Sequence, residues 1–167
     1  MNMTHYMELL AVNQPWNLLI YMAIPVVLAE TLAITELYLL FTRNWSGAIH
    51  AVNRFVGIAV GLYFCGVIAY LTINAVVPIT KAGEWRSIID VVAVGCYLIG
   101  GLPLICIALQ ELGLINRGAS QNQKIKVHAV CVALFLVFGH IAMIAGMLDP
   151  ALFGYVPGAA NAMPVHH

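Results

Sequence analysis

The chain has 167 residues, of which 62% are hydrophobic and only 8% are charged. An ordinary soluble domain carries about 25% charged residues, so this composition excludes a soluble globular protein. Seven Lys and Arg residues balance seven Asp and Glu residues, which leaves no basic field to attract nucleic acid. We therefore expect an integral membrane protein whose surroundings are the lipid bilayer, with no nucleic-acid partner.

Four apolar stretches follow one another along the chain, each long enough to cross a bilayer at about 20 residues per helix. Polar or helix-breaking residues separate these stretches, which extend over residues 16–42, 48–80, 88–115 and 125–148. Residues 1–15 form an N-terminal interfacial segment, and residues 149–167 form a tail rich in proline and glycine. Short connections join neighbouring antiparallel helices, so the sequence predicts an all-α, up-down-up-down bundle of four transmembrane helices.

The distribution of Lys and Arg predicts the orientation of this bundle, because cytoplasmic loops are enriched in these residues. The second connection carries Lys81 and Arg86, and the two tails carry neither Lys nor Arg. The other two connections, with their helix ends, carry Arg43, Arg54, Arg117, Lys124 and Lys126. We therefore expect both termini on the non-cytoplasmic side of a cell membrane of the bacterial inner-membrane type.

Ionisable side chains inside the predicted spans are the candidates for a functional site. Such a side chain costs about 2.5–3.5 kcal/mol in a spanning helix, so it usually faces the bundle interior and serves a pathway or a site. The candidates are Glu30, Glu36, His50, Arg54, Glu111, His128 and His140.

Four of these residues lie at similar depths near the predicted cytoplasmic end. At a rise of about 1.5 Å per residue, Glu36, His50, Glu111 and His128 all fall within roughly 10 Å of that end, one from each helix. Carboxylates and imidazoles bind iron, copper and zinc, so this set predicts a metal site in the bundle core. The Glu-x-x-His spacing of di-iron bundles is missing on both helices that carry these histidines.

His50 and His128 also suggest a different cofactor. The second and fourth helices of an up-down bundle lie diagonally across the core, so the two imidazoles would serve as axial ligands of one b-type haem. Arg54, one turn from His50, would then pair with a haem propionate. The metal and haem hypotheses both stay open at this point.

Glu30 and His140 form a second candidate site. Depth counting places both residues near the bilayer middle or its outer half, on helices that an up-down bundle can make neighbours. A buried carboxyl group and an imidazole can exchange a proton at physiological pH, which predicts a proton path or a quinone-binding pair. The alternative is a structural hydrogen bond from Glu30 to Thr31 or Thr35.

Both ends of the chain carry possible ligands for copper, which suits thioether and imidazole groups. These residues are Met1, Met3, His5, Met7, Met163, His166 and His167. An ordinary methionine-rich interfacial segment explains the same residues.

The sequence thus predicts a small multi-pass membrane protein that binds haem b or a His/Glu-ligated metal. It would pass electrons or protons to a quinone or to a larger membrane complex. The alternatives are a small proton-linked transporter and an accessory subunit of a membrane complex. Gly57 and Gly61 allow close helix contact, either within the chain or in a homodimer, and Pro25 and Pro103 weaken the backbone hydrogen bonding of their helices.

Overall fold

The computed structural model describes residues 3–155, and all regular structure in that range is helical, without a strand. Four helices are long and apolar enough to span a membrane, and they extend over Trp16–Thr42, Ala48–Ala82, Ile88–Glu111 and Gln121–Met147. The prediction of an all-α chain with four helices long and apolar enough to span a membrane is confirmed. A short helix, α1 (His5–Ala11), precedes them, and a 3₁₀ turn at Pro150–Phe153 follows them.

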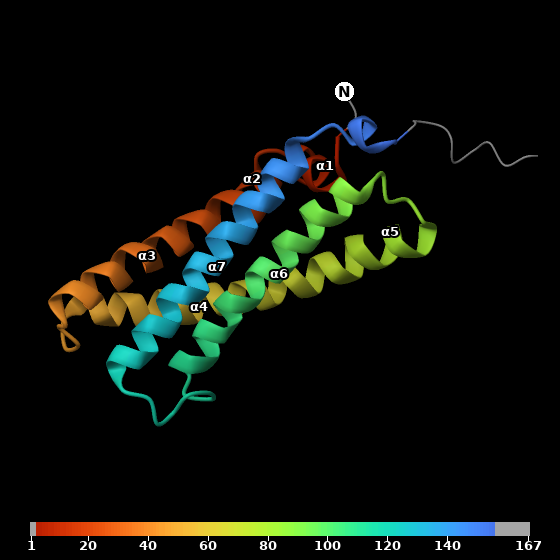
Figure 1. Cartoon of the computed structure of the whole chain (residues 1–167). Helices are drawn as coiled ribbons and strands as arrows, with labels where there is room; N and C mark the ends of the chain where they lie inside the picture. Colours follow the sequence, from red (N-terminus) through yellow and green to blue (C-terminus); the bar gives the residue numbers. More distant parts are fainter. Residues whose placement is uncertain (1–2, 156–167) are drawn as a thin grey trace, which may run out of the picture.

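The long helices form a ring in which each contacts two neighbours (Figure 1). The first helix, which begins with α2 (Trp16–Leu18) and ends with α3 (Ile24–Thr42), packs against α4 (Ala48–Leu71) and α7 (Gln121–Met147). The third, α6 (Ile88–Glu111), also contacts α4 and α7. The turn from α3 to α4 and the loop from α6 to α7 lie at one end, and the turn after α5 (Val77–Ala82) lies at the other.

Two helix boundaries differ from the predicted ones by four residues because of local capping. α7 begins four residues before the predicted start, since Ser120 and Gln123 form a reciprocal capping box at its N-terminus. α6 ends at Glu111 rather than near residue 115, because Gly113 adopts a left-handed conformation with φ of 71°.

Pro25 has a visible effect on the first helix. Proline lacks an N–H group, so carbonyls in the preceding turn lose their helical donor. A π-helical turn (Leu19–Ala23) lies just before it, and two tyrosines from other helices serve its carbonyls. Tyr97 donates its hydroxyl to the Tyr21 carbonyl at 2.8 Å, and Tyr63 donates to the Ile20 carbonyl at 2.5 Å. These bonds attach the first helix to α6 and α4.

The N-terminal segment packs into one end of the bundle. Tyr6 and Leu10 of α1 are buried, and Thr4 donates its hydroxyl to the Gly146 carbonyl of α7 at 2.7 Å. A Cβ atom on Gly146 would lie only 2.6 Å from the Tyr6 ring. The absence of a side chain at this position therefore allows α1 to dock.

Small residues bring α4 and α6 into close contact. A Cβ atom on Gly61 would lie 2.2 Å from the Ala108 Cβ and 2.8 Å from the Leu104 carbonyl oxygen. A Cβ atom on Gly57 would meet Ile107 at 3.0 Å. The pair of glycines predicted to mediate close helix contact thus packs within the chain.

Gly61→Leu should destabilise the bundle, because its side chain has to displace the α6 backbone. We expect a loss of about 1–3 kcal/mol or more, seen as a lower thermal unfolding midpoint in detergent. Gly66→Leu is the matched control on the same helix, since a Cβ atom there meets nothing within 4 Å. Equal midpoints for the two variants would contradict this packing of α4 against α6.

Candidate functional site

Four ionisable side chains meet at the end of the bundle that holds the turn from α3 to α4. Each long helix contributes one of them: Glu36 from α3, Arg54 from α4, Glu111 from α6 and His128 from α7. The Nδ1 atom of His128 lies 3.6 Å from Glu36 Oε1, and its Nε2 atom lies 3.3 Å from Glu111 Oε1. Arg54 Nε lies 3.5 Å from the other oxygen of Glu111. We call these four residues the ion cluster.

The ion cluster extends from the core to the surface. His128 is 1% exposed and Glu36 is 2% exposed. The side chain of Glu111 is 15% exposed and that of Arg54 is 60% exposed. One end of the cluster is therefore open to its surroundings while the other is enclosed.

The imidazole of His128 lies between two carboxylates, one near each ring nitrogen. Its two nitrogens face different partners, so the three side chains do not converge on one point. No group of three His, Cys, Asp or Glu residues suited to a metal ion is found among residues 3–155. Both nitrogens of His128 and both oxygens of Glu36 are buried without a hydrogen bond in that range. Buried polar atoms nearly always have a hydrogen-bond partner, so the unbonded atoms of Glu36 and His128 are unusual.

The charges of the ion cluster balance in two ways. If Arg54 balances an ionised Glu111, a cluster with no net charge leaves one proton for Glu36 and His128 together. The pair can be a neutral carboxyl group with a neutral imidazole, or a carboxylate with an imidazolium. Both states have the same net charge, so a proton can move between them without creating an uncompensated charge in the interior.

Two buried amides hold the helices beside the ion cluster. Asn53 is 2% exposed and donates to the hydroxyl of Thr35, the residue before Glu36, at 2.8 Å. Gln110 is 1% exposed and donates to the Lys124 carbonyl at 3.1 Å. The sequence analysis did not select these amides, although a polar amide in an apolar span is itself a signal.

His50 lies apart from this arrangement. It is partly exposed at the start of α4, and its ring packs edge-on against Trp45 with 6.5 Å between ring centroids. Within the described part of the chain, no hydrogen bond or ion pair joins His50 to the ion cluster. The structure thus brings together three of the four predicted metal ligands with Arg54. Haem ligation by His50 and His128 stays a prediction.

Glu30 and His140 line one pocket of about 200 Å³ on the flank formed by α3 and α7. His140 Nδ1 lies 2.6 Å from the Leu136 carbonyl, so this nitrogen carries the donated hydrogen. Thr31 and Thr35 donate their hydroxyls to backbone carbonyls of their own helix. The alternative structural hydrogen bond from Glu30 to either threonine is not formed.

An ion pair that the sequence analysis did not select lies at the other end of the bundle. Asp90, in the first turn of α6, is fully buried. His5 donates to it twice, through its backbone N–H at 2.7 Å and through ring Nδ1 at 2.5 Å. Arg86 contacts Glu8 and the Met3 carbonyl nearby. Asp90 lies at the edge of a predicted span, where an acidic residue looks like an ordinary interfacial one.

The candidate copper ligand His5 thus bonds to Asp90 in this structure. The remaining candidates of the copper hypothesis include Met1, Met163, His166 and His167, which lie outside the described residues.

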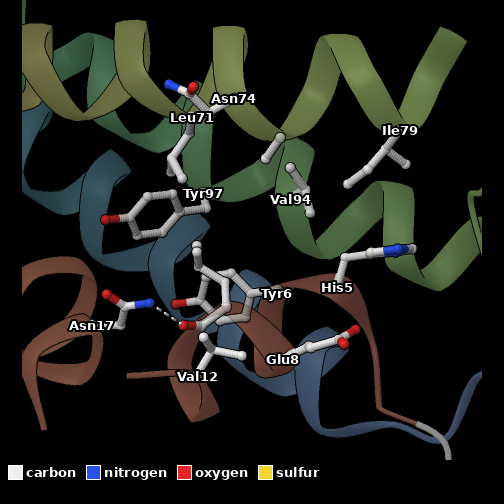
Figure 2. A pocket seen from close by; sticks show the side chains of 12 residues that line it. His5, Tyr6, Glu8, Val12, Asn17, Leu71, Asn74, Ile79, Val94 and Tyr97 are labelled. Carbon is white, nitrogen blue, oxygen red and sulfur yellow. Dashed lines mark hydrogen bonds between the residues drawn. The ribbon is translucent and has the colours of Figure 1, made fainter. Parts of the chain in front are cut away.

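A cleft of about 260 Å³ lies beside α1 (Figure 2). His5, Tyr6 and Glu8 line it from α1, and Tyr97 lines it from α6. The rings of Tyr6 and Tyr97 pack together with 5.5 Å between centroids. Both tyrosines also line the pocket of Glu30 and His140, so they form a wall between the two spaces. Burial raises the pKa of Tyr6 to about 12.

The four apolar helices and the ion cluster in their core indicate a multi-pass membrane protein. The chain belongs to the family described as "Family of unknown function (DUF6803)", whose profile matches residues 1–162. Neither a curated protein nor a solved structure shows significant similarity to the chain.

His5→Ala should loosen the docking of α1, because it removes the ring that bonds to the buried carboxylate of Asp90. Asp90 keeps the backbone N–H groups of His5 and Arg86 as donors, so the variant loses one hydrogen bond to a charged group. Such a bond is worth about 1.5–3 kcal/mol, so amide hydrogen exchange in α1 should accelerate roughly ten- to 150-fold. Glu8→Gln is the control, since its partner pair with Arg86 is more exposed and worth about 0–1 kcal/mol. Equal exchange rates in the two variants would contradict this role of Asp90.

Proposed function

We propose that this protein transfers protons across part of a membrane through a relay of Glu111, His128 and Glu36. The observation that carries the proposal is the imidazole of His128 with one carboxylate at each nitrogen. An imidazole can accept a proton at one nitrogen and release another from the opposite nitrogen. The ion cluster provides the donor, the bridge and the acceptor that such a step needs.

The exposure gradient gives the relay a direction. Glu111 and Arg54 form the accessible end, where Glu111 takes a proton from the aqueous side. The step begins with a neutral His128 that carries its hydrogen on Nδ1 and with a Glu36 that has lost its own proton. Glu111 then protonates Nε2 of His128, and Nδ1 releases its proton to the Glu36 carboxylate. Glu36 also lines a groove of about 160 Å³ between α3 and α7. The other side chains of this groove are apolar, so an acceptor that takes the proton from Glu36 would have to enter the groove itself.

Charge distribution supports an orientation for this relay. The ion cluster lies at the end of the bundle where two connections and their adjoining helix ends carry Arg43, Arg54, Arg117, Lys124 and Lys126. In an up-down-up-down bundle with both termini on the non-cytoplasmic side, its accessible end faces the cytoplasm. We place the protein in a cell membrane of the bacterial inner-membrane type. Proton-linked transport and proton delivery to a quinone or a partner subunit both use a relay of this kind.

A bound redox cofactor is the second candidate. The buried, unbonded atoms of Glu36 and His128 favour it, because such atoms are also available to a zinc, iron or copper ion. Haem b would instead require His128 and His50 to act together.

The orientation can be tested with single cysteines. A membrane-impermeant maleimide applied to intact cells should label a cysteine at Glu84, in the second connection, and not one at Arg117, in the third. The control is the same pair after the membrane is permeabilised, when both should react. Labelling of the Arg117 position alone in intact cells would reverse the orientation.

Replacing His128 by Gln should stop the relay, because glutamine keeps polar atoms near both carboxylates but cannot carry the proton. In liposomes loaded with a pH-sensitive dye and energised by a potassium gradient, proton flux should fall at least 100-fold, within the range for a lost acid–base group. His50→Gln is the matched control, since this histidine lies outside the ion cluster, and its flux should equal that of the wild type. Wild-type flux no greater than that of empty liposomes would refute the proposal.

The same preparations distinguish the relay from a redox cofactor. Metal analysis and a reduced-minus-oxidised absorption spectrum should show neither stoichiometric metal nor haem in the wild type. A stoichiometric metal lost in His128→Gln would favour the metal site instead. A haem spectrum lost in both histidine variants would favour haem with His50 and His128 as ligands.

A further inference from the structure

The pocket lined by Glu30 and His140 on the α3–α7 flank takes no part in the proposed relay. Its walls are mainly apolar and aromatic, yet Glu30 and His140 are both exposed beside it. An ionisable side chain at this depth is costly where it faces lipid, so it is expected to serve a ligand or a pathway. The other lining residues include Tyr6, Met22, Pro25, Tyr97, Phe135 and Gly139.

The two polar groups offer complementary hydrogen bonding. Because Nδ1 of His140 donates to the Leu136 carbonyl, Nε2 of the neutral ring is left as an acceptor. Glu30 forms no hydrogen bond or ion pair with any residue from 3 to 155, so its carboxyl group is free to bond to a ligand. A ligand with a hydroxyl group and a second oxygen would match both.

The space in front of these groups suits a flat ring. Three aromatic rings, those of Tyr6, Tyr97 and Phe135, contribute to the walls. At Gly139 an added Cβ atom would meet nothing within 4 Å, so this part of α7 leaves the pocket open. Leu136 lines both this pocket and the neighbouring groove between α3 and α7. The groove is lined almost entirely by Ala, Val and Leu, which suits an apolar tail.

We propose that this pocket binds the head group of a lipid-soluble quinol. One ring hydroxyl donates to Nε2 of His140, and the oxygen on the far side of the ring bonds to Glu30. The ring lies among the aromatic walls, and the tail follows the groove past Leu136. The proposal concerns binding only and does not depend on proton transfer by the ion cluster.

Binding can be measured by calorimetry on the full chain in lipid nanodiscs, with decylubiquinol kept reduced under anaerobic conditions as the probe. Empty nanodiscs give the background from partition into lipid. We expect saturable binding that weakens at least tenfold in Gly139→Leu, because the new side chain fills the pocket. Gly66→Leu is the matched control: it adds the same side chain in open space on α4, outside the pocket, and should change the affinity less than twofold.

The polar contacts are tested separately. His140→Leu and Glu30→Gln should each weaken binding severalfold, and the thermal midpoint of each variant reports whether it is folded. The dimethyl ether of decylubiquinol has no hydroxyl to donate and should bind at least tenfold more weakly than the quinol. His128→Gln should bind the quinol as the wild type does, whatever its proton flux.

Several results would overturn the proposal. They are binding no stronger than to empty nanodiscs, equal affinity of Gly139→Leu and the wild type, and equal affinity for the quinol and its ether. Saturable binding of tetraphenylphosphonium that depends on Glu30, without binding of the quinol, would show that the pocket takes organic cations instead.

Discussion

The cost of placing charge among apolar helices governs this structure. With 8% charged residues, the chain can keep a carboxylate or an imidazole in its core only beside a group that balances it. His128 meets this condition through Glu36 on one side and Glu111 on the other, and Arg54 balances the second carboxylate. Since each of the four residues comes from a different helix, these contacts join all four helices at one end of the bundle.

A second constraint arises from backbone hydrogen bonds. Pro25 leaves carbonyls without helical donors inside an apolar segment, where no water is at hand to bond to them. The hydroxyls of Tyr63 and Tyr97 take over this role. The consequence for function lies in the position of Tyr97, whose ring stands beside Tyr6 and forms part of two pockets. The hydroxyl that serves the broken turn of the first helix thus belongs to a side chain that also separates two pockets.

Depth could be predicted from the sequence, whereas rotation about each helix axis could not. Counting residues from the helix ends placed Glu36, Glu111 and His128 at one level, and the structure brings them together. The same count included His50, which lies beside Trp45 instead. Rotation could not be inferred because these helices are apolar on nearly all sides and offer no polar face. Asp90 escaped selection because its partner is supplied by the N-terminal segment, whose docking depends on tertiary contacts distant in sequence.

The two seams of the bundle differ in a way that connects the proposed functions. Between α4 and α6, glycines allow the backbones to approach so closely that little space is left at Gly61. Between α3 and α7, the seam holds both the pocket of Glu30 and His140 and the groove that reaches Glu36. Leu136 is common to these two spaces. The proposed ligand site and the enclosed end of the proposed relay therefore lie on one flank of the bundle, and a ligand whose tail follows the groove past Leu136 would lie beside the Glu36 carboxyl group.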